Sequence, residues 1–225
     1  MSNLYNKALV GLLLLFLAMA ALLFVPPWTF DYWQAWIFLA VYFTASITIS
    51  LYLIKGDPQL LARRMSGGPA AEKLSAQKII MSLTSLGFIG LLLVPALDRR
   101  FAWSHLSAGV ALAGDALVVL GWLGIYFVFR ENSFASATIE LAPDQKVIST
   151  GPYALVRHPM YVAALVMLLG IPIALGSWWG VLVMVAIVPA LIWRLLDEEK
   201  FLGKNLPGYR EYQATVRYRL IPRVW

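Results

Sequence analysis

Six long apolar stretches divide this 225-residue chain and constrain its fold more than any other feature. A helix needs about 20 apolar residues to cross a bilayer, and a helix satisfies its own backbone polar groups where no water is present. We therefore predict an all-α integral membrane protein with about six transmembrane helices. The expected spans are Asn6–Val25, Trp33–Ile54, Ile79–Leu97, Leu106–Phe129, Pro159–Leu175 and Trp178–Leu195.

The composition supports a membrane protein and excludes several kinds of site. The chain is 60% hydrophobic and 13% charged, whereas a soluble domain is nearer half apolar and a quarter charged. The net charge of +6 indicates contact with anionic membrane lipids rather than nucleic acid, because no soluble basic domain is present to bind one. The absence of cysteine excludes disulfides and thiol nucleophiles. His105 and His158 are too far apart in the sequence to suggest a zinc site, so we expect no metal.

Lysine and arginine residues predict the orientation of the spans. They gather in the segments 55–78 and 130–158 and in the C-terminal tail, whereas the opposite side offers Arg99 and Arg100. Cytoplasmic loops carry such an excess of basic residues. We expect a multi-pass protein of the cell inner membrane with both termini in the cytoplasm. The segment 55–78, which is rich in glycine near its middle, is expected to be a mobile loop.

The last two expected spans are joined by Gly176-Ser177 alone, so they must form an antiparallel hairpin. Polar residues stand where this hairpin opens toward the cytoplasm. His158 and Tyr161 lie at the start of the fifth span, and Arg194 and Glu198 lie at the end of the sixth. We expect these four side chains to meet in one pocket, beside a helix N-terminus whose free N–H groups attract anions.

Each of these residues also has a structural interpretation. An isolated Arg157 would anchor its helix at the interface and bind lipid phosphate. Arg194 and Glu198, four residues apart, could form a surface ion pair worth about 0.3 kcal/mol. Asp115 lies inside the fourth span, far from the pocket, and a structural hydrogen bond is its simplest role.

Four motifs in the C-terminal half resemble the isoprenylcysteine carboxyl methyltransferase family, which is related more broadly to the membrane phospholipid methyltransferases. The resemblance extends from Asn132 to Pro222. The motifs are Gly151-Pro152-Tyr153, Arg157-His158-Pro159-Met160-Tyr161, Glu198-Glu199, and a tail with Tyr209, Tyr212 and Arg217.

The resemblance implies methyl transfer from S-adenosylmethionine without a Rossmann domain. It implies a catalytic membrane core over 106–225, whose pocket is capped by the linker 130–158 and the tail 197–225, preceded by three N-terminal spans over 1–105. Arg194 would orient the reacting end of the substrate, and Thr138 could add a linker contact. The implied cofactor-binding residues are Gln145, Lys146, Val147, Ile148, Tyr153, His158, Pro159, Met160, Tyr161 and Glu198.

Methyl transfer is an in-line displacement that needs positioning more than acid–base chemistry. A carboxylate acceptor arrives ionised, and Arg194 could hold it through a bidentate pair. An amine acceptor would need a base, for which His158 or a tyrosine is nearby. We therefore expect a methyltransferase for a lipophilic acceptor, with a prenylcysteine-like carboxylate favoured. A phospholipid amine, a small thiol, a sterol-reductase-like enzyme using NADPH, and a non-catalytic membrane scaffold are the alternatives. The oligomeric state is not indicated.

Overall fold

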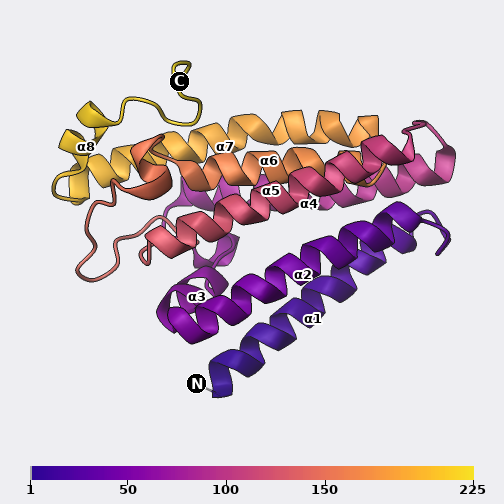
Figure 1. Cartoon of the computed structure of the whole chain (residues 1–225), viewed down its shortest axis with the longest axis horizontal. Coiled ribbons are helices and arrows are strands. Elements are labelled where there is room, and N and C mark those ends of the chain that lie inside the picture. The colour runs from indigo at the N-terminus through magenta and orange to yellow at the C-terminus, as the bar shows by residue number, and fades with distance from the viewer. Residues whose placement is uncertain (1) are drawn as a thin grey trace.

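The computed structural model describes residues 2–225 of the chain, and side chains from Leu4 onward. Regular structure in this part of the chain is helical throughout, which confirms the predicted all-α class. The long helices run side by side or nearly so, with the two N-terminal helices diverging from the rest (Figure 1). The long helices are α1 (Ser2–Phe24), α2 (Trp33–Gly56), α4 (Ser75–Phe101), α5 (Ala108–Glu131), α6 (Pro159–Ala174) and α7 (Trp178–Asn205). The short ones are α3 (Pro58–Met65), η1 (Pro69–Ala71), η2 (Gly151–Ala154) and α8 (Tyr209–Thr215).

Five of the described helices are long and apolar enough to cross a membrane: α1, α2, α4, α5 and α7. The fifth expected span, α6, has 16 residues and is roughly 24 Å long, shorter than a hydrocarbon core of about 30 Å. Pro159 sets its start, and Gly176, with φ +76°, allows the tight turn into α7. The predicted hairpin of two helices is therefore confirmed, and α6 is the shorter of the two helices.

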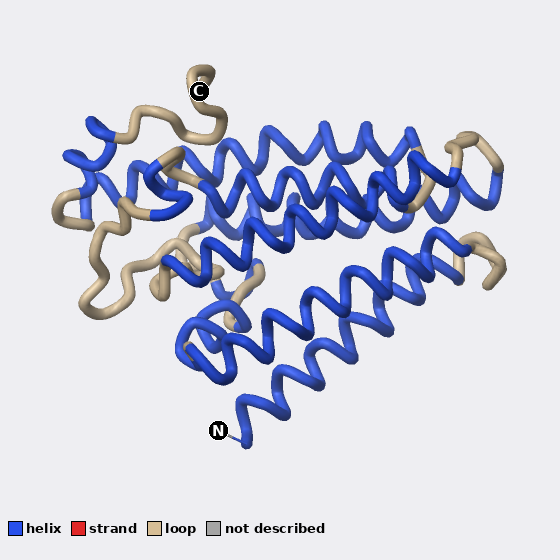
Figure 2. Tube along the Cα trace, viewed as in Figure 1, coloured by secondary structure: helices blue, strands red, loops and turns tan. Residues whose placement is uncertain are grey.

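The long polar segments gather at one end of the helices. The linker, α3 and α8 lie at this end together with both termini, while short connections close the other end (Figure 2). This arrangement places the segments that carry most of the lysine and arginine residues on one side. It agrees with the charge bias used to orient the chain, and the cytoplasmic location of this side stays a prediction.

Glycines allow α5 and α6 to pack backbone against backbone. A Cβ at Gly170 would lie 2.7 Å from the carbonyl oxygen of Gly114 and 2.8 Å from the nitrogen of Val118. A Cβ at Gly121 would lie 2.8 Å from the carbonyl oxygen of Ala163. Small residues let membrane helices approach this closely, where dispersion contacts hold them together. The contact fixes the position of the α6 N-terminus relative to the linker that leaves α5.

Gly170→Ala is expected to destabilise the protein by about 1–3 kcal/mol, because the added methyl group must push two backbones apart. Gly109→Ala, in α5 with nothing within 4 Å of the added carbon, is the matched control. Thermal unfolding in detergent should give a lower melting temperature for Gly170→Ala alone. Equal melting temperatures would show that α5 and α6 do not pack as closely as described.

Two sequence-based expectations about the polar end were wrong. The segment 55–78, expected to be a mobile loop, contains α3 and η1 and packs on the linker: a Cβ at Gly67 would lie 2.8 Å from that of Ala137. Glu198 and Leu202 suggest a separate short amphipathic helix at the start of the tail, but α7 continues unbroken to Asn205. The helix that the sequence suggests between the Pro207-Gly208 break and Pro222 is α8, which ends at Thr215.

Candidate functional site

A cavity of about 360 Å³ lies at the polar end, between the linker, the start of α6, the end of α7 and α8. Its size falls within the roughly 300–1,000 Å³ of pockets that hold small-molecule ligands. Arg194 and all ten residues predicted to bind a cofactor line it. These are Gln145, Lys146, Val147, Ile148, Tyr153, His158, Pro159, Met160, Tyr161 and Glu198. The hairpin argument thus predicted the convergence of His158, Tyr161, Arg194 and Glu198. The family resemblance implied the other residues, and the binding of a cofactor stays a prediction.

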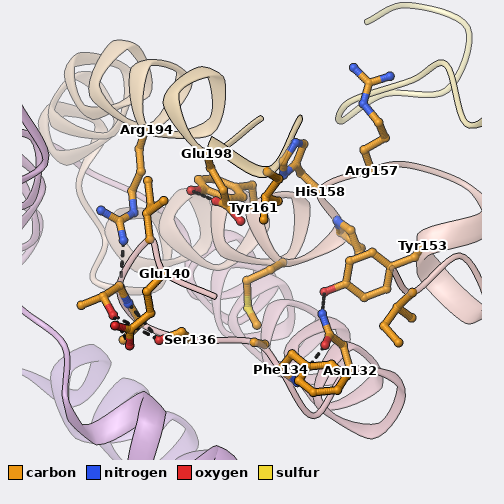
Figure 3. A pocket seen from close by; sticks show the side chains of 18 of the residues that line it. Asn132, Phe134, Ser136, Glu140, Tyr153, Arg157, His158, Tyr161, Arg194 and Glu198 are labelled. Atoms are coloured by element: carbon orange, nitrogen blue, oxygen red, sulfur yellow. Dashed lines mark hydrogen bonds between the residues drawn. The ribbon is translucent and has the colours of Figure 1, made fainter. Parts of the chain in front are cut away.

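The carboxylate of Glu198 points into this cavity from α7. It accepts a 2.7 Å hydrogen bond from the hydroxyl of Tyr161, one of the contacts drawn in Figure 3. The ring of Tyr161 in turn meets that of His158 edge to face, with centroids 5.6 Å apart. Within residues 4–225, no lysine, arginine or histidine nitrogen lies within 4.0 Å of Glu198. The half-buried carboxylate therefore keeps its charge available to a ligand.

Arg194 forms its ion pair with Glu72 and not with Glu198. The interpretation of Arg194 and Glu198 as a surface ion pair was therefore wrong. Arg194 Nη1 donates to Gln77 Oε1 at 2.9 Å and lies 2.8 Å from Glu72 Oε1. The contact with Glu72 is an ion pair rather than a hydrogen bond, because Glu72 Oε1 accepts no N–H of suitable geometry. Arg194 Nη2 donates to the carbonyl oxygen of Ala137 at 2.8 Å. These contacts leave some of the guanidinium N–H groups free for an acceptor.

A buried ionic network lies beside the cavity and centres on Glu199, which belongs to the Glu198-Glu199 motif but was given no role from the sequence. Arg157 Nε donates to Glu199 Oε1 at 2.7 Å, and Arg219 Nε donates to Oε2 at 2.9 Å. His158 Nε2 lies 3.1 Å from Oε1. Arg157 is 7% exposed and points away from Glu198 (Figure 3). It is therefore part of the protein interior and not the lipid anchor that was considered.

The C-terminal strap, residues 216–225, closes the start of α6. The N–H of Arg157 donates to the carbonyl oxygen of Tyr218 at 2.9 Å, and that of His158 donates to the carbonyl oxygen of Arg219 at 3.0 Å. Arg157 Nη1 also donates to the carbonyl oxygens of Val216 and Arg217. The strap thus takes the N–H groups of the two residues that precede α6, and within the helix the N–H groups of Tyr161 and Val162 donate to the carbonyl oxygen of His158. The anion site expected at this helix N-terminus stays a prediction.

Three more tyrosines, Tyr153, Tyr209 and Tyr212, complete the wall of the cavity. Asn132 Nδ2 donates to the Tyr153 hydroxyl at 2.8 Å, and the Tyr212 hydroxyl donates to the Tyr153 carbonyl oxygen at 2.7 Å. Tyr209 also lines the cavity and is 5% exposed. Its buried hydroxyl has no hydrogen-bond partner among the described residues. Because buried hydroxyl groups normally form a hydrogen bond, we expect a ligand in the cavity to supply the missing partner of Tyr209.

Burial raises the pKa of the Tyr153 phenol to about 12. The unfolded chain releases this proton near pH 10, so between these values the folded protein binds more protons and loses stability as pH rises. Tyr153→Phe should therefore show a smaller fall in melting temperature between pH 10 and 12 than the wild type. Tyr5→Phe, a change at an exposed position, should keep the wild-type fall. A Tyr153→Phe profile parallel to the wild type would contradict this assignment.

Asp115 lies in α5 outside this cavity. It is 5% exposed, and neither carboxylate oxygen has a hydrogen-bond partner among the described residues. The structural hydrogen bond expected for Asp115 is therefore not formed with any residue that the structure describes. The described residues also hold no cluster of three or more potential metal ligands.

Residues 110–207, close to half of the chain, match the family model described as "Phospholipid methyltransferase". This segment, 98 of the 225 residues, resembles the phospholipid methyltransferase family. The match confirms the resemblance to membrane methyltransferases that the motifs indicated. It includes most of α5, the linker, α6 and α7, which together form most of the cavity wall. It ends before Tyr209 and starts after Arg64, Glu72 and Gln77.

Two curated proteins resemble the same region. A cobalt-zinc-cadmium resistance protein, CzcN, of Cupriavidus metallidurans is 30% identical over 98 residues, which cover 43% of this chain and 45% of that protein. A nickel-cobalt-cadmium resistance protein, NccN, of Alcaligenes xylosoxydans xylosoxydans is 28% identical over 103 residues, or 43% and 46% of the two chains. The matched segment spans just under half of the length of each relative.

Proposed function

We propose that this protein is an S-adenosylmethionine-dependent methyltransferase that acts on a lipophilic acceptor at the membrane–cytosol interface. The observation that carries the proposal is the gathering of all the implied cofactor residues around one cavity within a segment of a methyltransferase family. The favoured reaction is methylation of a carboxylate on a prenylcysteine-like acceptor. A phospholipid amine is the second candidate, because the family description names phospholipids.

The residues present fit the cofactor. The unpaired Glu198 carboxylate suits the ammonium group of S-adenosylmethionine or its ribose hydroxyls, and the partnerless Tyr209 hydroxyl supplies a further hydrogen bond. The tyrosine rings at 153 and 161 suit a sulfonium, since aromatic faces attract cations. Val147 and Ile148 give the linker an apolar surface for the adenine ring. When bound, the cofactor would supply an electrophilic methyl group on sulfur.

The chain's own contribution to such a reaction is positioning and charge. A carboxylate acceptor needs no base, so Arg194 would hold it through the N–H groups that Gln77 and Ala137 leave free. Held by Glu72 and by those two contacts, the guanidinium is already oriented before an acceptor arrives. The strap and the linker would exclude water from the reacting groups. His158 Nε2 faces Glu199, so Nδ1 is the ring nitrogen that would have to accept a proton from an amine acceptor.

Lipid-side residues offer a place for the apolar part of the acceptor. Met81 and Thr84 of α4, Ala164 of α6 and Leu191 of α7 line the same cavity. A water-soluble cofactor would enter from the polar end, while the acceptor would reach the cavity along these helices. The N-terminal spans, which lie outside the family match, would then contribute to the choice of acceptor.

Transfer of a labelled methyl group to a panel of lipids tests the proposed function. We expect label in a lipophilic carboxylate acceptor, released by mild base as a methyl ester is, and no transfer in Arg194→Ala. Label in a phospholipid amine would support the second candidate. Binding of NADPH with no S-adenosylmethionine binding by the folded protein would instead support a reductase and contradict the proposal.

A further inference from the structure

Arg64 is a guanidinium that lines the cavity and that the sequence analysis did not single out. It lies in the last turn of α3, on the face that carries the buried Leu60 and Leu61. Asp57 caps this helix by accepting from the N–H of Leu60 at 2.9 Å. A capped helix with its apolar face buried holds Arg64 in a defined direction, toward the linker and the cavity.

The contacts of Arg64 leave its charge without a carboxylate partner. Nη1 donates to the carbonyl oxygen of Ser136 at 2.8 Å, and the guanidinium lies 5.5 Å from the ring centroid of Phe129. No carboxylate in residues 4–225 lies within 4.0 Å of it. Burial and the nearby Arg194 lower the pKa of Arg64. An anion at this position would offset both effects.

The linker brings Arg64 close to Arg194. The two guanidiniums donate to the carbonyl oxygens of consecutive residues, Ser136 and Ala137, each at 2.8 Å. Consecutive Cα atoms are about 3.8 Å apart, so the two guanidiniums lie within roughly 10 Å of each other. Glu72 lies 2.8 Å from Arg194, whereas the carboxylate that acts on Arg64 is the more distant Glu198, which only partly offsets the lowering of the pKa of Arg64. The cavity thus has an unpaired cation at this end and the unpaired carboxylate of Glu198 at the end of α7.

We propose that Arg64 binds the anionic head of the acceptor, a carboxylate or phosphate on an apolar chain, together with Arg194. This inference rests on the proposed function and names the substrate class more closely. Arg64 comes from the part of the chain outside the segment 110–207, whereas the implied cofactor residues lie within it. Met81 and Thr84 of α4 line the same cavity and provide a surface for the apolar chain.

The test measures binding of dodecanoate, dodecyl phosphate and dodecyltrimethylammonium to the full chain in phosphatidylcholine nanodiscs, with empty nanodiscs as the blank. Arg64→Gln should weaken binding of at least one of the two anions by about tenfold or more, because a charge-assisted hydrogen bond is lost. Arg64→Lys should recover part of the affinity. Binding of the cationic amphiphile should not fall, and S-adenosylmethionine affinity should change by less than about twofold, since the hydrogen bond and ring contact of Arg64 go to Ser136 and Phe129 and not to an implied cofactor residue.

Arg63→Gln is the matched control. Arg63 is the neighbouring arginine on α3 and also donates to a linker carbonyl oxygen, that of Ser133, but it does not line the cavity. An equal loss of anion binding in Arg63→Gln and Arg64→Gln would overturn the inference, because the role would then be to hold the linker. Unchanged anion binding in Arg64→Gln, or a loss of S-adenosylmethionine binding there, would also overturn it. A wild type that binds the anions through Arg64 but not S-adenosylmethionine would contradict only the proposed function.

Discussion

Glu198→Ala is expected to weaken S-adenosylmethionine binding by about 100-fold or more while the protein stays folded. The carboxylate has no basic partner among the described residues and lines the cavity, so a cationic ligand would supply its partner. Removing one member of a hydrogen-bonded charge pair costs about 2–5 kcal/mol in binding, and each 1.4 kcal/mol is about tenfold. Isothermal titration calorimetry of the purified variant in detergent measures its affinity for S-adenosylmethionine, and its melting temperature shows whether it is folded.

Tyr161→Phe is the matched control for this variant. It removes the hydroxyl that donates to Glu198 and keeps the aromatic face and the carboxylate. We expect its affinity to fall by about tenfold at most, because a single hydrogen bond contributes about 0.5–1.5 kcal/mol. A larger loss in Tyr161→Phe than in Glu198→Ala would mean that the carboxylate only orients the tyrosine.

Glu199→Ala should have the largest effect on stability, a loss of about 3–5 kcal/mol. The change leaves Arg157 and Arg219 without their shared carboxylate, and Arg157 is buried. Because the strap is attached through these arginines, it should also detach from α6. Melting temperature in detergent and the rate of protease cleavage within residues 216–225 measure the two consequences.

Glu211→Ala, a change of an exposed glutamate on α8, serves as the control for Glu199→Ala. It should leave both the melting temperature and the cleavage rate unchanged. The double variant Arg157→Met with Glu199→Leu should recover part of the lost stability, since it removes both members of the buried pair. A Glu199→Ala protein as stable and as resistant to protease as the wild type would refute the network.

The sequence predicted the parts of this site that depend on chain connectivity. The lengths of the apolar runs defined the helices, and the two-residue turn at Gly176-Ser177 forced the ends of α6 and α7 together. From that alone, His158, Tyr161, Arg194 and Glu198 were expected around one pocket. Local spacing was enough for these residues because a tight hairpin leaves the two helix ends no other arrangement.

What the sequence could not predict depends on helix rotation and on distant partners. Glu198 and Glu199 are adjacent, and only the rotation of α7 decides that Glu198 faces the cavity while Glu199 faces Arg157. The partner of Arg194 is Glu72, from a segment that looked like a loop. Arg64 was missed for the same reason: α3 has 8 residues, too few for a clear pattern. The capping sequence Asp57-Pro58 was the available signal for this helix.

Titration of the purified wild-type protein with S-adenosylmethionine tests the central claim most directly. The account predicts saturable binding at one site per chain in the wild type, and loss of that binding in Glu198→Ala at an unchanged melting temperature. A wild-type protein that is folded by its melting transition and releases no heat of binding with this cofactor, over a concentration range up to millimolar, would contradict the account.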